Sequence, residues 1–78
     1  MARFPDEIEY SSVYRDDNHE FEYRHISLPK EIYKSIPKLK LLNESECAFV
    51  GIHQSPGWVN YAIHSREPFI LLFRRKLK

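Results

Sequence analysis

The sequence is poor in glycine, cysteine and methionine: its 78 residues include two glycines, one cysteine and one methionine. The single Cys47 excludes an intramolecular disulfide, so the fold does not depend on disulfide bonds. No stretch approaches the roughly 20 apolar residues of a membrane-spanning helix. The N-terminal segment MARFPDEIEY also lacks the apolar core of a signal peptide. We therefore expect a soluble, intracellular protein without a membrane partner.

The chain also lacks a strong excess of either charge. It has 12 basic and 11 acidic residues, which gives a formal net charge of +1. A protein that binds duplex nucleic acid usually carries a larger basic excess, because neutralising phosphates supplies much of its affinity. Only the segment from Arg74 to Lys78 is locally basic, as is typical of a solvated terminus. We expect no nucleic-acid partner, and a small nucleic-acid-binding protein is the weakest of three functional hypotheses.

The chain has enough hydrophobic and aromatic residues to form a hydrophobic core. Hydrophobic residues make up 42% and aromatic residues 14% of the sequence, which is typical of a folded protein rather than a disordered one. A chain of this length forms one domain that buries only about 60% of its unfolded surface. We find no internal repeat or linker, and predict a single domain over residues 1–78.

Hydrophobic periodicity predicts four strands. Alternation of apolar and polar residues indicates the first three, and a continuous apolar run indicates the fourth, which should therefore lie inside the sheet. The turn cluster Asp16-Asp17-Asn18 suggests that the first two strands form a hairpin with a loop of more than two residues. The expected strands cover residues 8–14, 20–26, 58–64 and 69–73.

The alternation also assigns side chains to faces. In the second strand one face carries Phe21, Tyr23 and His25, and the other carries Glu20, Glu22 and Arg24. In the third strand one face carries Val59, Tyr61 and Ile63, and the other carries Trp58, Asn60, Ala62 and His64.

Two short helices are predicted between the second and third strands. Pro29 suits the first position of one helix, which Pro37 stops. Asn43 can cap the other, with Glu46 three residues on in a variant of the capping box, and Gly51 is placed to end it. Its expected apolar side consists of Phe49 and Val50, and Cys47 is expected to be a small packed side chain rather than a nucleophile.

The order strand, strand, helix, helix, strand, strand predicts an α+β fold. We expect a four-stranded antiparallel sheet with the two helices packed on it.

Four residues could together hold an anion. If the second and fourth strands are neighbours, the guanidinium groups of Arg24 and Arg75 can converge, with Ser55 and Trp58 on the nearby turn. Phosphate offers strong acceptor oxygens to arginine, hydroxyl and indole donors. A simpler interpretation is that Arg24 pairs with Glu20 or Glu22 and that Arg75 belongs to a solvated tail.

The sequence shows no catalytic or metal-binding motif. The four histidines do not have the spacing of metal ligands, and Cys47 has no CxxC partner. Ser55 does not lie in a G-x-S-x-G elbow. We expect neither an enzyme nor a cofactor or metal, and interpret His25 and His64 as hydrogen-bonded packing residues.

Several separate motifs, in order and at matching spacing, resemble the Cks family, the small regulatory subunits of cyclin-dependent kinases. The resemblance extends from Tyr10 to Arg75. It is carried by EYRH at residues 22–25, LPK at 28–30, QSPGW at 54–58, the segment 61–64 and EPFILLFRR at 67–75.

The resemblance implies a non-catalytic protein of cell-cycle control, in the nucleus and/or cytoplasm. It would bind a cyclin-dependent kinase on one face and phosphothreonine-containing targets at an anion site, and so promote multisite phosphorylation. By motif position the anion site comprises Arg24, Gln54, Ser55, Trp58 and Arg75. The kinase-binding set comprises Tyr14, Tyr61, Ala62, Ile63, His64 and Glu67.

The chain departs from the family pattern at four places. The family usually has a basic residue where this chain has Val13, and Arg15 is the neighbouring cation that could replace it. The hinge His64-Ser65-Arg66-Glu67-Pro68 lacks the first of two usual prolines. Phe69 stands in place of a histidine. Cys47 stands in place of an aromatic residue in the second helix, so the contacts that some relatives make there with ubiquitin-ligase partners are not implied here.

The hinge bears on oligomeric state. In the family it either turns back, which gives a monomer, or extends and exchanges the last strand between two chains. With one proline fewer to fix the backbone, we expect a monomer, with the strand-exchanged dimer less favoured.

A second functional hypothesis is a stand-alone phosphopeptide- or anion-binding module that docks no kinase. The presence of Tyr14, His64 and Glu67 favours the kinase-bound adaptor over this alternative.

Overall fold

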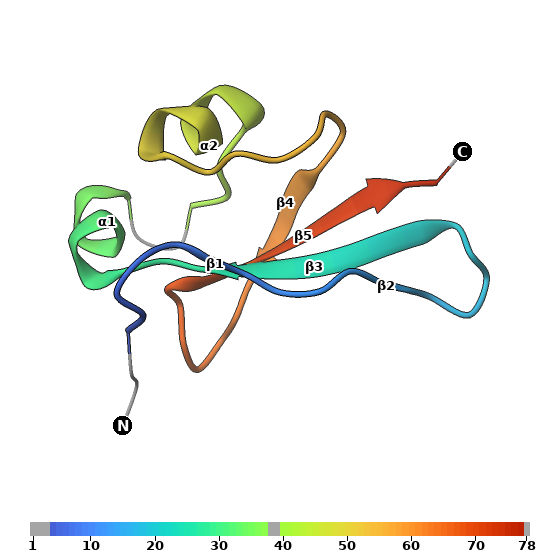
Figure 1. Ribbon diagram of the computed structural model, residues 1–78, viewed down its shortest axis with the longest axis horizontal. Coiled ribbons are helices and arrows are strands. Elements are labelled where there is room, and N and C mark those ends of the chain that lie inside the picture. Colours follow the sequence, from blue (N-terminus) through green and yellow to red (C-terminus); the bar gives the residue numbers. More distant parts are fainter. Residues whose placement is uncertain (1–3, 38–39, 78) are drawn as a thin grey trace.

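The apolar run near the C-terminus becomes β5 (Ile70–Lys76), the centre of an open antiparallel sheet (Figure 1). The computed structural model describes residues 4–37 and 40–77. Within these residues the sheet has five strands in the order β1-β3-β5-β4, and β2 also pairs with β3. The α+β prediction and the interior position of the last strand are confirmed. The other elements are β1 (Glu9–Tyr10), β2 (Tyr14–Arg15), β3 (Phe21–Ser27), α1 (Lys30–Ser35), α2 (Glu44–Val50) and β4 (Val59–Ile63).

The fifth strand arises because the predicted first strand is interrupted. Tyr10 pairs with Ile26 and Tyr14 pairs with Tyr23, so three residues of the first segment lie opposite two of β3. At this bulge the Ser11 hydroxyl accepts a hydrogen bond from the backbone N–H of His25 at 2.8 Å. A side chain thus replaces part of the backbone ladder, and one strand becomes β1 and β2.

The two faces of the sheet differ. We call the face that carries Ile26, Leu71 and Phe73 the covered face, because these side chains belong to the core beneath the helices. We call the opposite face, with Tyr23 and Leu72, the open face. Paired residues of neighbouring strands share a face, so the register assigns every strand residue to one of the two.

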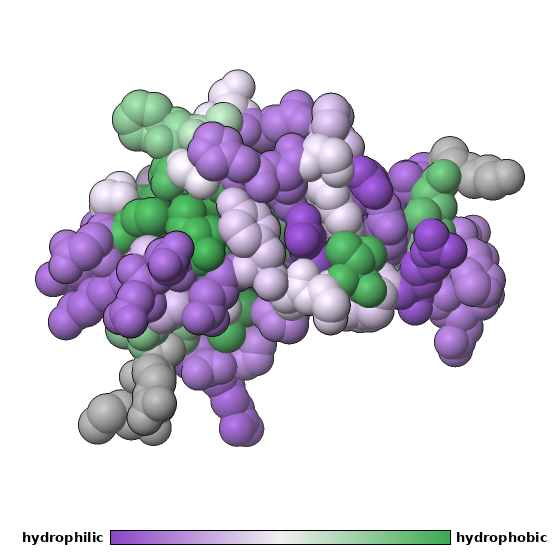
Figure 2. All heavy atoms as spheres, in the orientation of Figure 1, coloured by the Kyte–Doolittle hydropathy of each residue, from purple (hydrophilic) through white to green (hydrophobic). Residues whose placement is uncertain are grey.

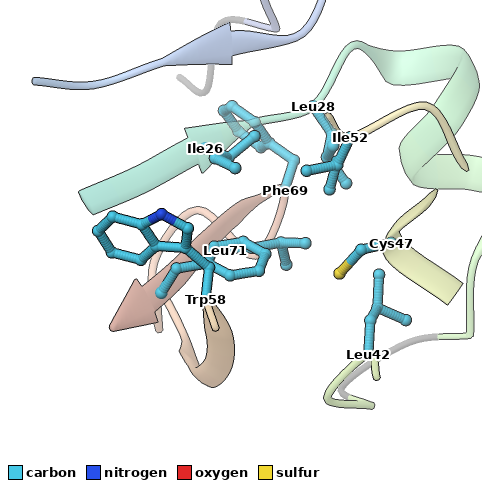
Figure 3. Packing of buried hydrophobic residues seen from close by; sticks show 9 residues of the cluster. Ile26, Leu28, Leu42, Cys47, Ile52, Trp58, Phe69 and Leu71 are labelled. Atoms are coloured by element: carbon cyan, nitrogen blue, oxygen red, sulfur yellow. The ribbon is translucent and has the colours of Figure 1, made fainter. Parts of the chain in front are cut away.

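The core is built from β3, β5, α2 and the loops that lead into them (Figure 3). Phe73 and Ile26 are fully buried at its centre. Burying a large apolar side chain contributes about 1.5–3 kcal/mol, so this cluster holds the two short helices on the sheet. Its members are Ile26, Leu28, Leu42, Cys47, Ile52, Trp58, Phe69, Leu71 and Phe73.

A bulge in β4 reverses the faces of its last residues relative to the prediction for the third strand. Asn60 pairs with Phe73 and Ala62 pairs with Leu72, so Tyr61 is an extra residue in the ladder. From that point the alternation reverses. Ala62 therefore lies on the open face and Ile63 on the covered face, opposite to the prediction. The faces predicted for Asn60 and Val59 are correct.

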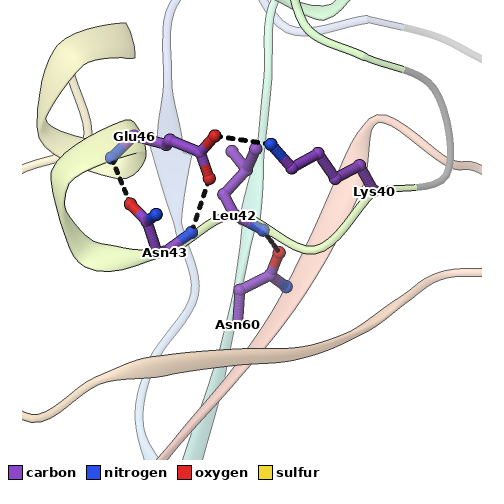
Figure 4. Close-up of polar contacts among 5 residues, drawn as sticks. All are labelled: Lys40, Leu42, Asn43, Glu46 and Asn60. Atoms are coloured by element: carbon purple, nitrogen blue, oxygen red, sulfur yellow. Dashed lines mark hydrogen bonds and ion pairs between the residues drawn. The ribbon is translucent and has the colours of Figure 1, made fainter.

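The amide of buried Asn60 organises this bulge. Its nitrogen donates to the backbone carbonyls of Ala62 and Leu72, at 2.9 and 3.0 Å. Its oxygen accepts from the N–H of Leu42 at 2.9 Å, which fixes the segment before α2 to β4 (Figure 4). Because all three contacts satisfy buried polar groups, Asn60 is the polar link between sheet and helices.

Helix α2 begins and ends as predicted. Asn43 and Glu46 form a reciprocal capping box, and Gly51 ends the helix in the left-handed conformation, at φ 104° (Figure 4). The side chain of Lys40 donates to the Glu46 carboxylate at 2.7 Å. This hydrogen bond, followed by the capping contact with Asn43, lowers the pKa of Glu46.

Two details of the helices differ from the prediction. Pro29 is the N-cap of α1 and not its first helical residue. Phe49 does not face the core but is 91% exposed, whereas Cys47 is buried and Val50 packs against the core. Successive α-helical residues are about 100° apart, so Phe49, two positions from Cys47, points away from the sheet. Burial raises the pKa of the Cys47 thiol, as do Glu46 and Glu44 to a lesser extent.

Candidate functional site

The covered face carries a cationic pocket at the end of the sheet beyond the helices. Arg24 and Arg75 come from neighbouring strands, β3 and β5, as predicted. Their guanidinium carbons lie 5.3 and 5.0 Å from the centre of the Trp58 ring, which is buried. Two like charges thus share one aromatic surface, which stabilises each cation through the ring electrons.

Two polar neighbours orient Arg75. Its Nε donates to the Glu22 carboxylate, and its Nη1 donates to the Ser55 hydroxyl at 2.6 Å. Glu22 is buried and directly opposite Arg75 in the ladder. The simpler interpretation above is therefore wrong in its details, because Glu22 pairs with Arg75, and Arg75 is part of β5 and not a free tail.

Gly57 is required for the approach of the turn to Arg75. Its φ is 99°, which side-chain-bearing residues rarely adopt. A Cβ added there would lie 3.2 Å from the Cδ of Arg75. The sequence-based site did not include Gly57, although its place between Ser55 and Trp58 in the Pro-Gly turn is visible in the sequence.

Arg24 contrasts with Arg75 because no described carboxylate pairs with it. Its Nη2 makes one long contact, 3.5 Å, with the carbonyl of Ser11, and its buried Nε has no acceptor among the described residues. The guanidinium carbon also lies 5.3 Å from the centre of the Tyr10 ring. Buried donors are normally satisfied, so an arginine in this state indicates a place for an anion.

The remaining predicted anion-site residues flank this pocket. Gln54 lies next to Ser55 and is partly buried, with a side-chain oxygen that makes no hydrogen bond to a described residue. Arg15 pairs with Glu22 across the β2–β3 ladder, so it shares the covered face with the pocket. Arg15 is exposed. Glu22 lies between Arg15 and Arg75 across the sheet, because it pairs with Arg15 of β2 on one side and with Arg75 of β5 on the other.

The open face carries a cluster of tyrosines. Tyr14 stacks on Tyr23 with ring centres 5.7 Å apart, and Tyr23 meets the edge of Tyr61 at 5.9 Å. Tyr14 is 55% exposed although it is large and apolar. Burial, together with Tyr14 and Tyr23, raises the pKa of Tyr61, and Arg74 opposes this shift. The structure therefore brings the predicted Tyr14 and Tyr61 together through Tyr23, which the prediction omitted.

Arg74 is a second residue of the open face that the sequence analysis did not select. Its guanidinium carbon lies 4.6 Å from the ring centre of Phe21 and 5.1 Å from that of Tyr61. Side chains alternate along β5, so Arg74 and Arg75 serve opposite faces of the sheet. Arg74 could have been found from the sequence, because it directly precedes Arg75 at the end of a predicted strand and must therefore point to the opposite face.

The other predicted docking residues follow β4 into the hinge. Ala62 is on the open face, whereas Ile63 packs against the core. The ring Nδ1 of His64 accepts hydrogen bonds from the backbone N–H groups of Arg66 and Glu67, at 3.3 and 3.1 Å. These contacts close the hinge into a turn, so that β5 returns beside β4 of the same chain.

The histidine interpretation is correct for one of its two residues. His64 is partly buried and hydrogen bonded, but the side chain of His25 is exposed on the open face. Across residues 4–37 and 40–77, no group of three or more His, Cys, Asp or Glu side chains could hold a metal ion. No helix in the described part of the chain is long and apolar enough to cross a membrane.

Comparison with known proteins assigns this small α+β domain to one class, the regulatory subunits of protein kinases. The chain belongs to the CKS family, described as cyclin-dependent kinase regulatory subunits, whose family model matches residues 8–77. It is 55% identical over 71 residues to "Cyclin-dependent kinases regulatory subunit 2" of Arabidopsis thaliana, covering 91% of this chain and 83% of that protein.

Similar proteins come from distant organisms. The chain is 54% identical to "Cyclin-dependent kinases regulatory subunit 2" of Xenopus laevis, covering 90% of this chain and 86% of that protein. It is 52% identical to "Cyclin-dependent kinases regulatory subunit" of Drosophila melanogaster, covering 88% and 90%. The resemblance seen in the sequence motifs is confirmed.

Proposed function

We propose that this protein is a non-catalytic subunit that binds a cyclin-dependent kinase through the open face and phosphothreonine through the cationic pocket. It acts in the cell cycle, in the nucleus or cytoplasm. By holding targets that already carry one phosphate, it directs the kinase to further sites on the same target. Arg24, Ser55, Trp58 and Arg75 form the phosphate site, with Gln54 and Arg15 beside it.

The observation that carries the phosphate proposal is the unpaired state of Arg24. No described carboxylate neutralises it, while Glu22 and Ser55 hold Arg75 in place next to it. A phosphate placed between the two guanidinium groups would supply the missing counter-charge and acceptors. Because Arg75 is already oriented, little side-chain entropy is lost on binding.

Calorimetric titration tests this proposal with a phosphothreonine-proline peptide and its unphosphorylated twin. We expect only the phosphorylated peptide to bind. In Arg24→Ala the loss of charged hydrogen bonds, worth about 1.5–3 kcal/mol, should weaken binding roughly 10- to 150-fold. Kinase binding of this variant should stay within about twofold, since distant sites act independently. Equal binding of the two peptides would refute the phosphate site.

The exposed tyrosines support the kinase part of the proposal. Tyr14 stacks on Tyr23 while remaining 55% exposed, and aromatic residues are enriched at protein interfaces. Capture of a cyclin-dependent kinase by the immobilised chain, with Tyr61→Glu as the disrupting variant, is the direct test. No capture, together with intact phosphopeptide binding, would instead establish the stand-alone phosphopeptide module.

We also propose a monomer, because the hinge is closed by the two hydrogen bonds to His64 and lacks one usual proline. Light scattering at micromolar concentration should give the mass of one chain. A predominant dimer would contradict this.

A further inference from the structure

A side cavity of about 190 Å³ opens beside the cationic pocket and shares Ser55 and Trp58 with it. It lies between α2 and the turn that precedes β4, and Ala48 and Ile52 give it apolar walls. Sites for small molecules usually exceed about 300 Å³, so this cavity has the size of a single side chain. None of the functions assigned above uses it.

Two of the residues that line the side cavity carry acceptors with no partner within the described chain. The carboxylate of Glu44 pairs with no described cation, whereas Glu46, on the same helix, is paired with Lys40. The side-chain oxygen of Gln54 is buried without a hydrogen bond to a described residue. Apolar walls with unpaired acceptors suit a side chain that has an aliphatic stem and a cationic end.

We propose that the side cavity binds a lysine or arginine side chain of the phosphorylated target, so that phosphothreonine sites with a nearby basic residue are preferred. This specificity rests on the proposed phosphate site. An extended peptide advances about 3.3–3.6 Å per residue, and the cavity shares two residues with the pocket. The basic residue therefore lies within about three positions of the phosphothreonine.

The stem of the basic side chain packs on Ala48, Ile52 and the edge of Trp58, and its charge reaches the exposed carboxylate of Glu44. Arg24 and Arg75 repel the same charge, which keeps it out of the phosphate site and fixes the direction in which the peptide lies. His53 also lines the cavity, and among the lining residues it alone can carry a positive charge.

The test is fluorescence anisotropy with labelled phosphothreonine-proline peptides, in which one lysine is moved through the three positions on either side. At one position lysine should bind about two- to fivefold more tightly than alanine, the range of an exposed ion pair. Norleucine, which has the stem without the charge, should gain less. If lysine at every position binds like alanine while the phosphopeptides still bind, the side-cavity proposal is wrong and the phosphate site stands.

Three variants complete the experiment. Glu44→Gln removes the charge, and Ala48→Phe blocks the cavity. Both variants should abolish the lysine preference and leave the affinity for the alanine peptide unchanged. Glu31→Gln, an exposed site on α1, makes the same change in net charge and should keep the preference. A lysine preference that survives in Glu44→Gln would overturn the proposal as general charge attraction. Failure of every phosphopeptide to bind would refute the phosphate site itself.

Discussion

The two faces of one sheet present opposite kinds of surface. On the covered face, the cationic pocket holds two arginines against a buried indole, and a buried carboxylate and a hydroxyl fix Arg75 there. On the open face, exposed Tyr14 stacks on half-buried Tyr23, which meets the edge of half-buried Tyr61. Side chains of successive residues in a strand point to opposite faces, so Arg74 and Arg75 are adjacent in β5 yet lie on different faces. The difference teaches that one strand is enough to keep two surfaces of a small domain separate.

The largest expected effect comes from removing what both faces share. Phe73 is fully buried in β5, and Phe73→Ala should lower the free energy of unfolding by about 3–5 kcal/mol through lost burial and a cavity. Both binding activities should fall in proportion to the unfolded fraction. Urea denaturation measures the loss, and a change under 1 kcal/mol would show that the core is not the common support.

A change confined to the covered face should separate the two activities. In Gly57→Ala a left-handed backbone carries a Cβ that meets Arg75, at a cost of about 1–2 kcal/mol. Phosphopeptide affinity should drop about tenfold by calorimetry, with kinase binding unchanged.

Gly51→Ala is the matched control for Gly57→Ala. It also has a positive φ, but its added Cβ would meet only Ile8, 3.5 Å away. It should destabilise the fold to a similar extent without changing phosphopeptide affinity. If both glycine variants weaken binding equally, the effect of Gly57 is stability alone.

A change confined to the open face should have the converse effect. Tyr23→Ala removes the ring that joins Tyr14 to Tyr61, and aromatic pairs contribute about 0.5–1.5 kcal/mol each. Kinase affinity should fall about fivefold in surface plasmon resonance, with phosphopeptide binding intact. Leu41→Ala, an exposed apolar residue outside the sheet, is the control and should change neither.

The smallest effect concerns α2, which borders the covered face. The folded-state pKa of Glu46 is lowered, so its stabilisation is present at neutral pH and is lost as pH falls through that lowered value. Glu46→Gln keeps a capping oxygen but loses the ion pair with Lys40. The variant should have a slightly lower urea midpoint than the native chain at pH 7. The difference should shrink as the pH falls and the carboxylate becomes protonated.

Patterns local in sequence predicted much of this fold. The apolar run in β5 showed an interior strand, and the Asn43–Glu46 box with Gly51 gave both ends of α2. The convergence of Arg24 and Arg75 followed because it required only that their strands be neighbours.

The misses have a common physical cause, which is contact between residues distant in the chain. The interruption at Ser11 depends on its hydroxyl bonding β3, and the reversal at Tyr61 depends on Asn60 bonding β5. Neither contact leaves a trace in hydrophobic periodicity. The role of Glu22 was missed for the same reason, because its partner is 53 residues away.

The carboxylate of Glu22 has a practical consequence for experiments that imitate phosphorylation. A glutamate or aspartate introduced in place of a target threonine offers Arg75 a carboxylate, but Arg75 is already paired with the carboxylate of Glu22. Glu22 belongs to the same chain, so its effective concentration at Arg75 is high. Phosphate can compete because it brings a charge of about −1.5 to −2 and three acceptor oxygens. Acidic phosphomimetic variants of a target should therefore behave towards this protein as unmodified sites.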